Sequence, residues 1–388
     1  MNKNILHTEV QHFIKTYDAN LSKLAFSGSP FPKVTVQELL QQIEGYRKAE
    51  SKLPGWSGTD GIYYPLKLNL EQTSSETTAK YKASLFSGKA MADLTGGFGV
   101  DSYFFSEQFE TVYHFEKDTE LSSIATHNFK TLNRENIKTI NRDAISAIEH
   151  MSFDLIYADP SRRHSTKGKV FYLRDCEPNI PDAIDYLLER CEVLMIKTSP
   201  MLDISVGIQE LQHVFEIHIV AVKNDVKELI WMLKKGNSEA VTIKTRNFVG
   251  ESSEKFDFEI NSEAEAEIGD PEQYLYEPNA AILKSGAFNH IAQCFKLRKL
   301  HKNTHLYSTN QLIEFPGRRF KIESAVPYSK KEMRAGITFD KANVATRNFP
   351  ETVSGLKKRW KITDGGDLYV FFTTGSKNQK MMLLCSKI

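Results

Sequence analysis

The chain has 388 residues, 40% of them hydrophobic and 11% aromatic, which is enough for two or three domains with packed cores. No apolar run reaches the length of a membrane span, and no charged-then-apolar signal segment opens the chain, so we expect a cytoplasmic protein. Its four cysteines lack metal or redox spacing, which predicts free thiols and no bound metal.

The formal net charge of +1 conceals an uneven distribution along the chain. Residues 296–388 hold 19 Lys and Arg against 7 Asp and Glu, a balance of +12. Residues 1–295 therefore hold 31 against 42, a balance of −11. Such an asymmetry indicates a polyanionic partner for the C-terminal part, and a basic surface that is only solvated is the other interpretation.

Residues 1–70 predict a small helical domain. Apolar residues recur at three- and four-residue steps between positions 10 and 17, which is the period of an amphipathic helix. A second helical pattern starts at residue 36, with Thr35 as its N-cap. Further along, Thr73-Ser-Ser-Glu76 predicts a capping box that opens a helix running to Phe86. These polar residues serve capping alone, or the helix lies across a ligand site built by the segment that follows.

That following segment, Asp93-Leu-Thr95-Gly-Gly97-Phe-Gly99-Val-Asp101, joins a short apolar strand to a helical pattern. Gly97 and Gly99 allow positive φ and leave room where a Cβ would collide with a ligand. The spacing resembles motif I of the class I S-adenosylmethionine (SAM) methyltransferases. It fits the dinucleotide fingerprint less well, because position 102 is serine and not the third glycine. Asp93, Thr95, Gly97, Gly99 and Asp101 are therefore the first cofactor-binding candidates.

Two more acids follow short strands and complete the predicted cofactor site. Glu116 ends the strand-like run 111–116, where a carboxylate can accept both ribose hydroxyls of a bound adenosine, in NAD as well as in SAM. Residues 137–140 predict a third strand, and Asp143 lies just beyond it. In SAM enzymes an acid at this place commonly contacts the adenine amino group.

Residues 153–158 predict a fourth, fully buried parallel strand, which runs into Asp159-Pro160. Ligands of open α/β sheets bind at the carboxyl ends of the strands, so Asp159 and Pro160 are the catalytic candidates. The Asp159 carboxylate could orient an exocyclic amine or accept its proton. Pro160 would stiffen the loop and offer a carbonyl without a competing N–H.

The run Asp159-Pro160-Ser161-Arg162-Arg163 resembles motif IV of nucleic-acid methyltransferases, but it departs from the usual Asp/Asn-Pro-Pro-aromatic pattern. The missing aromatic, which stacks on a flipped base, argues against N-methylation of a base. Arg162 and Arg163 suit substrate phosphates or stacking on a base; exposed loop charges are the alternative.

Residues 192–197 predict a fifth strand, and Lys197 at its end either borders the acceptor pocket or only closes the strand. The strands at 215–222 and 228–233 are too close in sequence for a parallel crossover, so they predict an antiparallel hairpin. The fold class is therefore α/β, with a Rossmann-like seven-stranded sheet that ends in an antiparallel hairpin. This architecture is typical of class I methyltransferases and not of the all-parallel NAD fold.

Residues 240–388 mix strands and helices without strict alternation, which predicts an α+β region. Within it, Lys357-Lys358-Arg359-Trp360-Lys361 interleaves an aromatic with bases. Lys357, Lys358 and Arg359 are substrate candidates that could contact RNA phosphates. A solvated helix face with a buried Trp360 is the alternative.

Taken as a whole, the chain resembles a bacterial family of class I SAM-dependent methyltransferases with a C-terminal THUMP-like domain preceded by a small ferredoxin-like piece. The segments that carry this resemblance are residues 71–86, 93–101, 159–163, 197–203, 276–283, 346–350 and 364–367. The resulting division is a helical domain (1–70), a SAM-dependent methyltransferase domain (71–238), a linker with the ferredoxin-like piece (239–310) and a basic THUMP-like domain (311–388).

The resemblance implies SAM as the cofactor and, because THUMP domains bind RNA, a tRNA or rRNA as the substrate and partner. The leading hypothesis is thus an RNA methyltransferase in which the basic C-terminal domain positions the RNA. The alternatives are a DNA or small-molecule methyltransferase, and a non-catalytic RNA-binding protein with a SAM-type fold.

Overall fold

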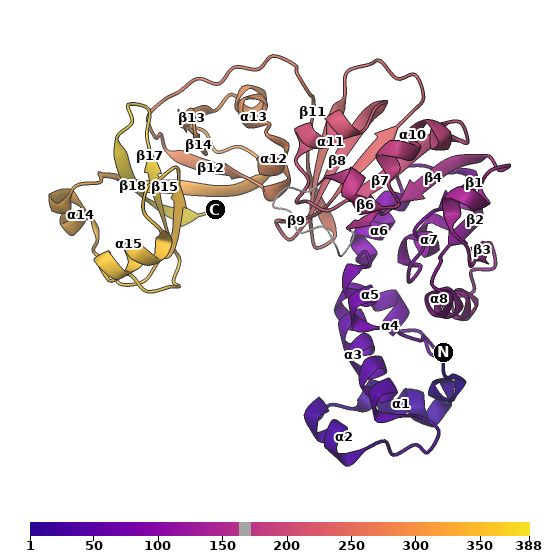
Figure 1. Cartoon of the computed structure of the whole chain (residues 1–388). Coiled ribbons are helices and arrows are strands. Elements are labelled where there is room, and N and C mark those ends of the chain that lie inside the picture. Colours follow the sequence, from indigo (N-terminus) through magenta and orange to yellow (C-terminus); the bar gives the residue numbers. More distant parts are fainter. Residues whose placement is uncertain (163–171) are drawn as a thin grey trace. The chain divides into compact units, whose positions relative to one another are not determined.

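The computed structural model describes residues 1–162 and 172–388 (Figure 1). The chain forms two compact units. The first comprises Met1–Glu216 and Leu229–Glu239, and the second comprises Ile217–Glu228 and Ala240–Ile388. The division passes through one β-hairpin, so each unit contains residues from both of its strands.

The first unit begins with short helices, as predicted. They are η1 (Lys3–Leu6), α1 (Thr8–Thr16), α2 (Leu21–Ser27), α3 (Val36–Lys52), α4 (Pro54–Ser57) and α5 (Lys67–Gln72). The N-cap at Thr35 is confirmed: its Oγ1 accepts a hydrogen bond from the Glu38 N–H at 3.2 Å, and the Glu38 carboxylate accepts one from the Thr35 N–H at 2.8 Å. This complete capping box fixes the start of α3, the longest helix of the region.

The central sheet follows, with parallel strands in the middle. Its first seven strands are β1 (Gly88–Asp93), β2 (Phe109–Phe115), β3 (Ile137–Ile140), β4 (Phe153–Ala158), β7 (Cys191–Thr198), β8 (Val214–Val222) and β9 (Asp225–Leu233). β1 pairs in parallel with both β2 and β4, β2 with β3, and β4 with β7, whereas β9 runs antiparallel to β7. The predicted fold class, an α/β sheet with a terminal antiparallel hairpin, is confirmed.

The hairpin itself is tighter than its sequence suggested. Only Lys223 and Asn224 separate β8 from β9, and both have positive φ, 53° and 62°. Two positive-φ residues in a row give the twist that suits a two-residue hairpin. β9 therefore starts at Asp225, three residues earlier than the apolar run that revealed it.

The sheet has nine strands, two more than the seven predicted. β10 (Thr242–Val249) and β11 (Ser252–Glu259) form a second hairpin, and the hydrogen-bonded order is β11-β10-β8-β9-β7-β4-β1-β2-β3. β10 alternates buried with partly buried residues, and β11 has one buried residue, so neither strand forms an apolar run, as expected near the edge of a sheet.

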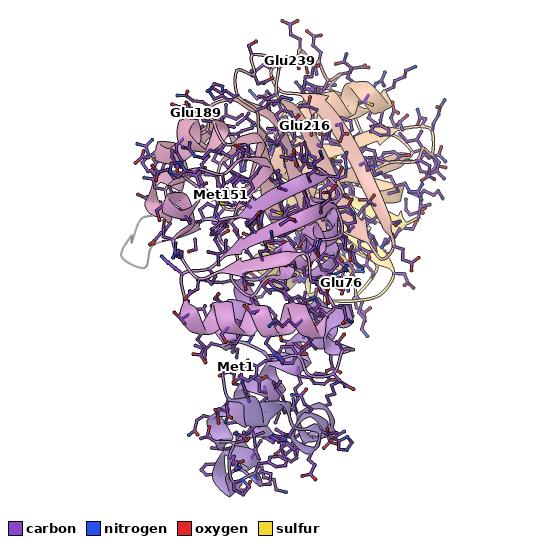
Figure 2. The ribbon with its side chains drawn as sticks, turned by 90° about the vertical axis from the view of Figure 1, so that its right-hand side faces the viewer. Met1, Glu76, Met151, Glu189, Glu216 and Glu239 are labelled. Carbon is purple, nitrogen blue, oxygen red and sulfur yellow. The ribbon has the colours of Figure 1, made fainter. Side chains whose placement is uncertain are left out.

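One helix precedes the parallel strands of the first unit, and five follow one or another of them. They are α6 (Glu76–Ala83), α7 (Val100–Phe105), α8 (Thr119–Thr131), α9 (Ala144–Ala147), α10 (Ile180–Leu188) and α11 (Ile204–Glu210). Figure 2 shows this unit with its side chains; Glu76 marks the start of α6, and Met151 and Glu189 mark the connections that enter β4 and β7. A minor sheet joins β5 (Ser161–Arg162) to β6 (Cys176–Glu177), with η2 (Leu173–Asp175) before it. No described helix is both long and apolar enough to cross a membrane.

The second unit contains a seven-stranded mixed sheet in the order β13-β14-β12-β15-β18-β17-β16. Its strands are β12 (Tyr274–Pro278), β13 (Arg298–His301), β14 (Thr304–Thr309), β15 (Gly317–Pro327), β16 (Asn343–Arg347), β17 (Leu368–Thr374) and β18 (Lys380–Lys387). Its helices are α12 (Ala280–Ser285), α13 (Phe288–Phe295), α14 (Lys330–Gly336) and α15 (Val353–Trp360). The α+β expectation for this region is met.

Residues 312–315 (Leu-Ile-Glu-Phe) have the apolar pattern of a strand and were counted among the strands of the α+β region, but this prediction is wrong: the segment has no sheet partner in the described structure. The Tyr276 hydroxyl takes the place of a strand ladder. It accepts a hydrogen bond from the Ile313 N–H at 3.0 Å and donates one to the Gln311 carbonyl at 2.8 Å. Phe315 is buried in the core nearby, which accounts for the apolar pattern that suggested a strand.

A buried carboxylate links three strands of this second sheet, β12, β15 and β16. Glu277, in β12, is 3% exposed. One of its oxygens accepts from Arg318 Nε at 2.6 Å, and the other accepts from Arg347 Nε at 2.6 Å. Removing one partner of a buried ion pair leaves charges uncompensated, which is strongly destabilising.

We therefore expect Glu277→Gln to lower the free energy of unfolding by roughly 2–4 kcal/mol, a value below the full buried-pair cost because both arginines are about one-third exposed. Urea denaturation measures this. The matched control is Glu314→Gln, whose exposed carboxylate pairs with Arg319 and should change stability by less than about 1 kcal/mol. Equal losses in the two variants would contradict a special role for Glu277.

Candidate active site

The loop between β1 and α7 is shaped from behind by Asp93, the last residue of β1. The Asp93 side chain accepts hydrogen bonds from the Thr95 N–H at 3.0 Å and from Ser102 Oγ at 2.6 Å. Asp93 is 1% exposed, and burial raises the pKa of its carboxyl to about 7. Both oxygens are used inside the loop, so this predicted cofactor residue holds the shape of the turn.

The loop contains three glycines, and each occupies its position for a different structural reason. Gly97 has φ of 56°, and a Cβ added there would meet only the Thr95 carbonyl oxygen, at 3.7 Å, so space remains open beside it. Gly99 has φ of 93°, and its Cβ would lie 2.4 Å from the Phe129 ring. Gly96, which the sequence analysis did not single out, lies against the His114 ring, 2.2 Å from a hypothetical Cβ. Only Gly97 fits the predicted role of admitting a ligand.

Glu116 and Gly97, both predicted cofactor residues, are in contact. One Glu116 oxygen accepts a hydrogen bond from the Gly97 N–H at 2.9 Å, and the other accepts from the Asp118 N–H at 2.7 Å. The acid at the end of β2 is thereby held beside the glycine turn at the end of β1. Asp143 is exposed and caps α9, accepting from the Ser146 N–H at 3.3 Å. Its recorded contacts are local, so the structure assigns it a capping contact.

The loop after β4 is joined directly to the glycine turn. The Asp159 N–H donates to Thr95 Oγ1 at 2.7 Å, and the Asp159 carboxylate forms an ion pair with Lys197 Nζ. Asp159 is half-buried and Pro160 is buried. Because β1, β4 and β7 are parallel neighbours, their carboxyl ends meet at one edge of the sheet. Lys197, near the end of β7, therefore lies beside Asp159.

Asp101 lies in a polar cluster that the sequence analysis only partly anticipated. Its carboxylate accepts hydrogen bonds from Ser74 Oγ and from the Tyr157 hydroxyl, both at 2.9 Å, and it lies 3.2 Å from Lys82 Nζ. Lys82 is fully buried and also donates to Ser74 Oγ at 2.9 Å. Burial alone would raise the pKa of the Asp101 carboxyl, but Lys82, Lys197 and the two hydroxyl groups bring it below its usual value.

Lys82 and Tyr157 were missed. A signal was present for Lys82, because it shares one face of α6 with the buried residues Thr78, Ala79 and Ala83. A lysine in the buried stripe of a helix requires a carboxylate partner. Tyr157 gave no signal, since an aromatic in an apolar strand normally fills the core.

The predicted capping box at Thr73 has the wrong register. Thr73 ends α5, and Ser75 is the N-cap of α6, accepting from the Thr78 N–H at 3.3 Å. Glu76 instead accepts from the Gly55 N–H at 3.0 Å and pairs with Lys80 at 2.6 Å. The helix ends at Ala83 and not at Phe86. Because Ser75 and not Ser74 caps the helix, the Ser74 hydroxyl can donate its hydrogen bond to Asp101.

The N-terminal helices add a cation close to this edge. Lys52, the last residue of α3, donates to the carbonyls of Leu70 and Glu71 at 3.0 and 2.8 Å. Burial, and then the positive charge of Lys197, lower the pKa of the Lys52 ammonium to about 8. Trp56 in α4 packs on Phe98 of the glycine turn, with ring centroids 4.8 Å apart. The helical region therefore forms part of the wall around the turn.

The remaining predicted substrate residues are Arg162 and Arg163 and, in the second unit, Lys357, Lys358 and Arg359. The backbone of Arg162 pairs with Cys176 in the minor sheet, while its side chain and the whole of Arg163 lie outside the described part of the chain. In the second unit, Lys357 pairs with Asp364, and Arg359 pairs with Glu351 at 2.8 Å. Lys358 is exposed.

Trp360 is half-buried and packs against a core cluster, so the interpretation of a buried aromatic is the better one for this residue.

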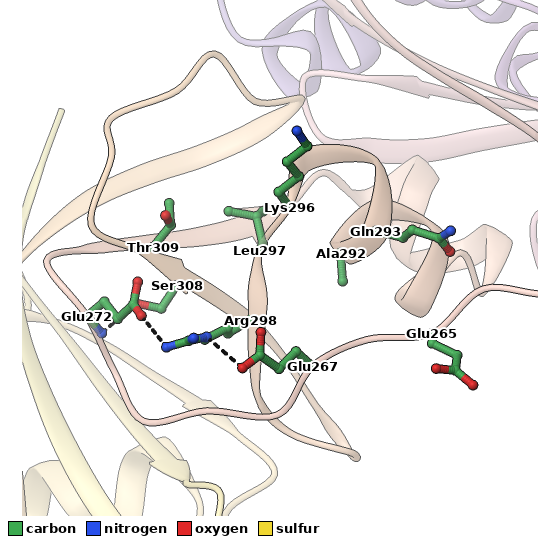
Figure 3. A pocket seen from close by; sticks show the side chains of 10 residues that line it. All are labelled: Glu265, Glu267, Glu272, Ala292, Gln293, Lys296, Leu297, Arg298, Ser308 and Thr309. Carbon is green, nitrogen blue, oxygen red and sulfur yellow. Dashed lines mark hydrogen bonds and ion pairs between the residues drawn. The ribbon is translucent and has the colours of Figure 1, made fainter.

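A cavity of about 390 Å³ lies in the second unit and contains none of the predicted site residues (Figure 3). Three carboxylates line it, those of Glu265, Glu267 and Glu272. Arg298 crosses it, 3.1 Å from Glu267 and 2.7 Å from Glu272. Within residues 1–162 and 172–388, no three His, Cys, Asp or Glu side chains are arranged so that they could hold a metal ion.

Comparisons with known proteins agree with this architecture. Family models match a ferredoxin-like domain at residues 274–316 and a THUMP domain-like segment at residues 317–387. The crystal structure of a putative methyltransferase from Porphyromonas gingivalis W83 is 31% identical, covers 99% of this chain and 98% of that chain, and has a TM-score of 0.88. A comparison with curated proteins found no match.

Two shorter structures match only part of the chain. An rRNA methylase from Streptococcus thermophilus is 19% identical and covers 41% of this chain and 94% of its own, with a TM-score of 0.31. A putative methyltransferase from Streptococcus mutans in complex with SAH is 17% identical and covers 41% and 97%, with a TM-score of 0.30.

The buried Asp93 predicts a pH dependence of stability. Its folded-state pKa of about 7 lies above the ~3.9 of an unfolded aspartate, so between these values the native state holds a proton that the unfolded state has lost. The associated stability is fully present below about pH 4 and is lost as the pH rises through 7. In urea denaturation, wild type should therefore lose stability relative to Asp93→Asn between about pH 5 and pH 8.

The Asp93→Asn comparison isolates this residue, because the opposite shift at Asp101 acts in both proteins. A difference between the two proteins that stays constant over this pH range would show that the Asp93 carboxyl titrates normally.

Proposed function

Because the chain belongs to the bacterial methyltransferase family with C-terminal ferredoxin-like and THUMP-like domains, we propose that it transfers a methyl group from SAM to RNA. The observation that carries this proposal is the hydrogen bond from the Asp159 N–H to Thr95 Oγ1. It joins the loop that resembles motif I to the loop that resembles motif IV, at the sheet edge where open α/β proteins bind their ligands.

The residues beside the glycine turn fit a SAM molecule. Gly97 leaves open space where a side chain would intrude, and Glu116 lies within hydrogen-bond distance of the same turn. Glu116 would accept the ribose hydroxyls, and Asp143 would contact the adenine amino group. Thr95, Gly99 and Asp101, with the buried Asp93, would keep the turn in shape. Bound SAM supplies an electrophilic methyl group on its sulfonium.

Asp159 is the residue best placed to handle the acceptor. Its Oδ2 is paired with Lys197, and among residues 1–162 and 172–388 no contact is recorded for its Oδ1. A carboxylate with one oxygen fixed and the other available can orient a donor group of the substrate. Pro160 holds the backbone of the loop behind it. Lys197 would position Asp159 and present a hydrogen-bond donor next to the acceptor oxygen.

The proposed division of labour follows the family. Residues 71–238 carry out methyl transfer, and the basic residues 311–388 hold the RNA. Arg162 and Arg163, three and four residues after Asp159, would contact a phosphate near the acceptor nucleotide. Residues 296–388 contain 19 Lys and Arg against 7 Asp and Glu, and this surplus of positive charge supports a polyanionic partner.

Cofactor binding is the first test. SAM should raise the melting temperature of the wild-type protein, because a ligand that binds only the native state stabilises it. Glu116→Gln should weaken SAM binding roughly tenfold, as expected when charge-assisted hydrogen bonds to a ribose are lost. The matched control is Glu110→Gln, an exposed carboxylate on the same strand β2. If SAM leaves the wild-type melting temperature unchanged, the cofactor assignment fails.

Methyl transfer is the second test. Tritiated SAM and RNA from a strain that lacks the gene should give labelled RNA, and nucleoside mass spectrometry identifies the product. Asp159→Ala should abolish labelling while SAM affinity stays within about twofold of wild type, because the proposal assigns this carboxylate to the acceptor and not to the ribose. If the variant lost SAM affinity to the same extent as methyl transfer, Asp159 would be reassigned to cofactor binding. Labelling of DNA or of small molecules instead of RNA would support the alternative substrates.

A further inference from the structure

Helices α14 and α15 form a single layer over one face of the second sheet. Met333 of α14 and Leu356 of α15 are fully buried in the same core cluster, which also contains Val370, Phe372 and Met382. Val370 and Phe372 are two residues apart on β17, and Phe372 pairs with Met382 of β18, so these side chains share one face of the sheet and both helices pack on that face. Because each helix is anchored by an apolar residue, its outward side chains are held on a rigid support.

The outward side of this layer is basic. Lys330, Lys331 and Arg334 of α14 are exposed, and so are Lys358 of α15 and Lys361, the residue that caps it. We call these five residues the basic helical face. Glu332 is the single acid of α14, so that helix keeps a net charge of +2.

Some cations of this layer already form ion pairs with carboxylates of the same unit, and others do not. Lys357 is paired with Asp364, and Arg359 with Glu351 and the Tyr328 hydroxyl. For the five residues of the basic helical face, no ion pair is recorded with any of residues 1–162 and 172–388. A paired cation must give up its carboxylate before it can bind a phosphate, whereas an unpaired one only exchanges water and counterions.

We infer that the basic helical face, and not the Lys357–Arg359 run as a whole, holds the phosphate backbone of the RNA. This inference rests on the proposed function for the identity of the polyanion. It moves the centre of the contact from α15 to α14, which the sequence analysis did not nominate. The cations of α14 lie within two helical turns, a spacing that suits successive phosphates of one strand.

The cavity of the same unit is a poor competitor for this role. Glu265, Glu267 and Glu272 line it, and its Arg298 is held between two of these carboxylates (Figure 3). The cavity also contains Lys296, but its three carboxylates outnumber its two cations, and Arg298 is already paired with two of them. The cavity should therefore attract a phosphate backbone less strongly than the basic helical face does.

The test compares unpaired with paired cations on the full-length protein. A labelled RNA hairpin with single-stranded flanks is titrated between about 50 and 200 mM salt, and log Kd is plotted against log salt concentration. The triple variant K330A/K331A/R334A should bind at least roughly tenfold more weakly at the lower salt concentration, and the slope should fall by about 2, that is about 0.7 for each lost phosphate contact. The control K357A/R359A removes paired cations, and its Kd should rise by about threefold at most, which is about 0.5 units of log Kd.

A triple variant that matches wild type in Kd and slope overturns the inference, and so does a control that loses as much as the triple variant. If the triple variant melts early, Lys331→Gln and Lys357→Gln replace the two multiple variants, with the larger loss of affinity expected for Lys331→Gln. The inference and the proposed function fail separately. Absence of methyl transfer by wild type contradicts the function, whereas unchanged RNA affinity of the α14 variant contradicts only the placement of the RNA.

Discussion

The contact between Lys82 and Asp101 is the interaction on which the candidate site depends. A fully buried ammonium is stable only where a carboxylate and further polar groups compensate for its lost hydration. Asp101 and Ser74 supply that compensation, at 3.2 and 2.9 Å. Because Lys82 lies on α6 and Asp101 on α7, this one cluster ties the segment before β1 to the segment after it. The glycine turn between them is thereby held from both ends, and Tyr157 adds β4 to the same cluster.

Much of this architecture followed from local sequence patterns. The buried parallel strands were visible as apolar runs, and the short spacing between the strands at β8 and β9 allowed only an antiparallel hairpin. The turn with Gly97 and the acid Glu116 were both assigned to the predicted cofactor site, and a hydrogen bond of 2.9 Å joins them. Such features are set within a few residues of the chain, by strand length, glycine placement and the position of an acid at a strand end.

What the sequence did not reveal depends on tertiary neighbours. The capping box was misplaced by two residues because Ser74, Ser75 and Thr73 are all capable caps, and only the ion cluster at Asp101 decides between them. The two edge strands β10 and β11 lack apolar runs, so their place in the sheet comes from pairing with β8 and not from their composition. Residues 312–315 have a strand-like pattern, but a tyrosine hydroxyl holds them as a loop.

The formal charge of the C-terminal part overstates the positive charge that it can offer to a partner, because several of its cations already form ion pairs. Arg318 and Arg347 neutralise Glu277 inside the unit, and Lys357 pairs with Asp364. The cations of α14 remain for a partner. Under the proposed function, affinity would then come from exposed charges that salt screens, while the chemistry relies on sheltered pairs such as Lys197 with Asp159, which salt screens far less. Binding and catalysis should therefore respond differently to ionic strength: salt weakens the capture of RNA, and the rate of methyl transfer at saturating RNA changes little.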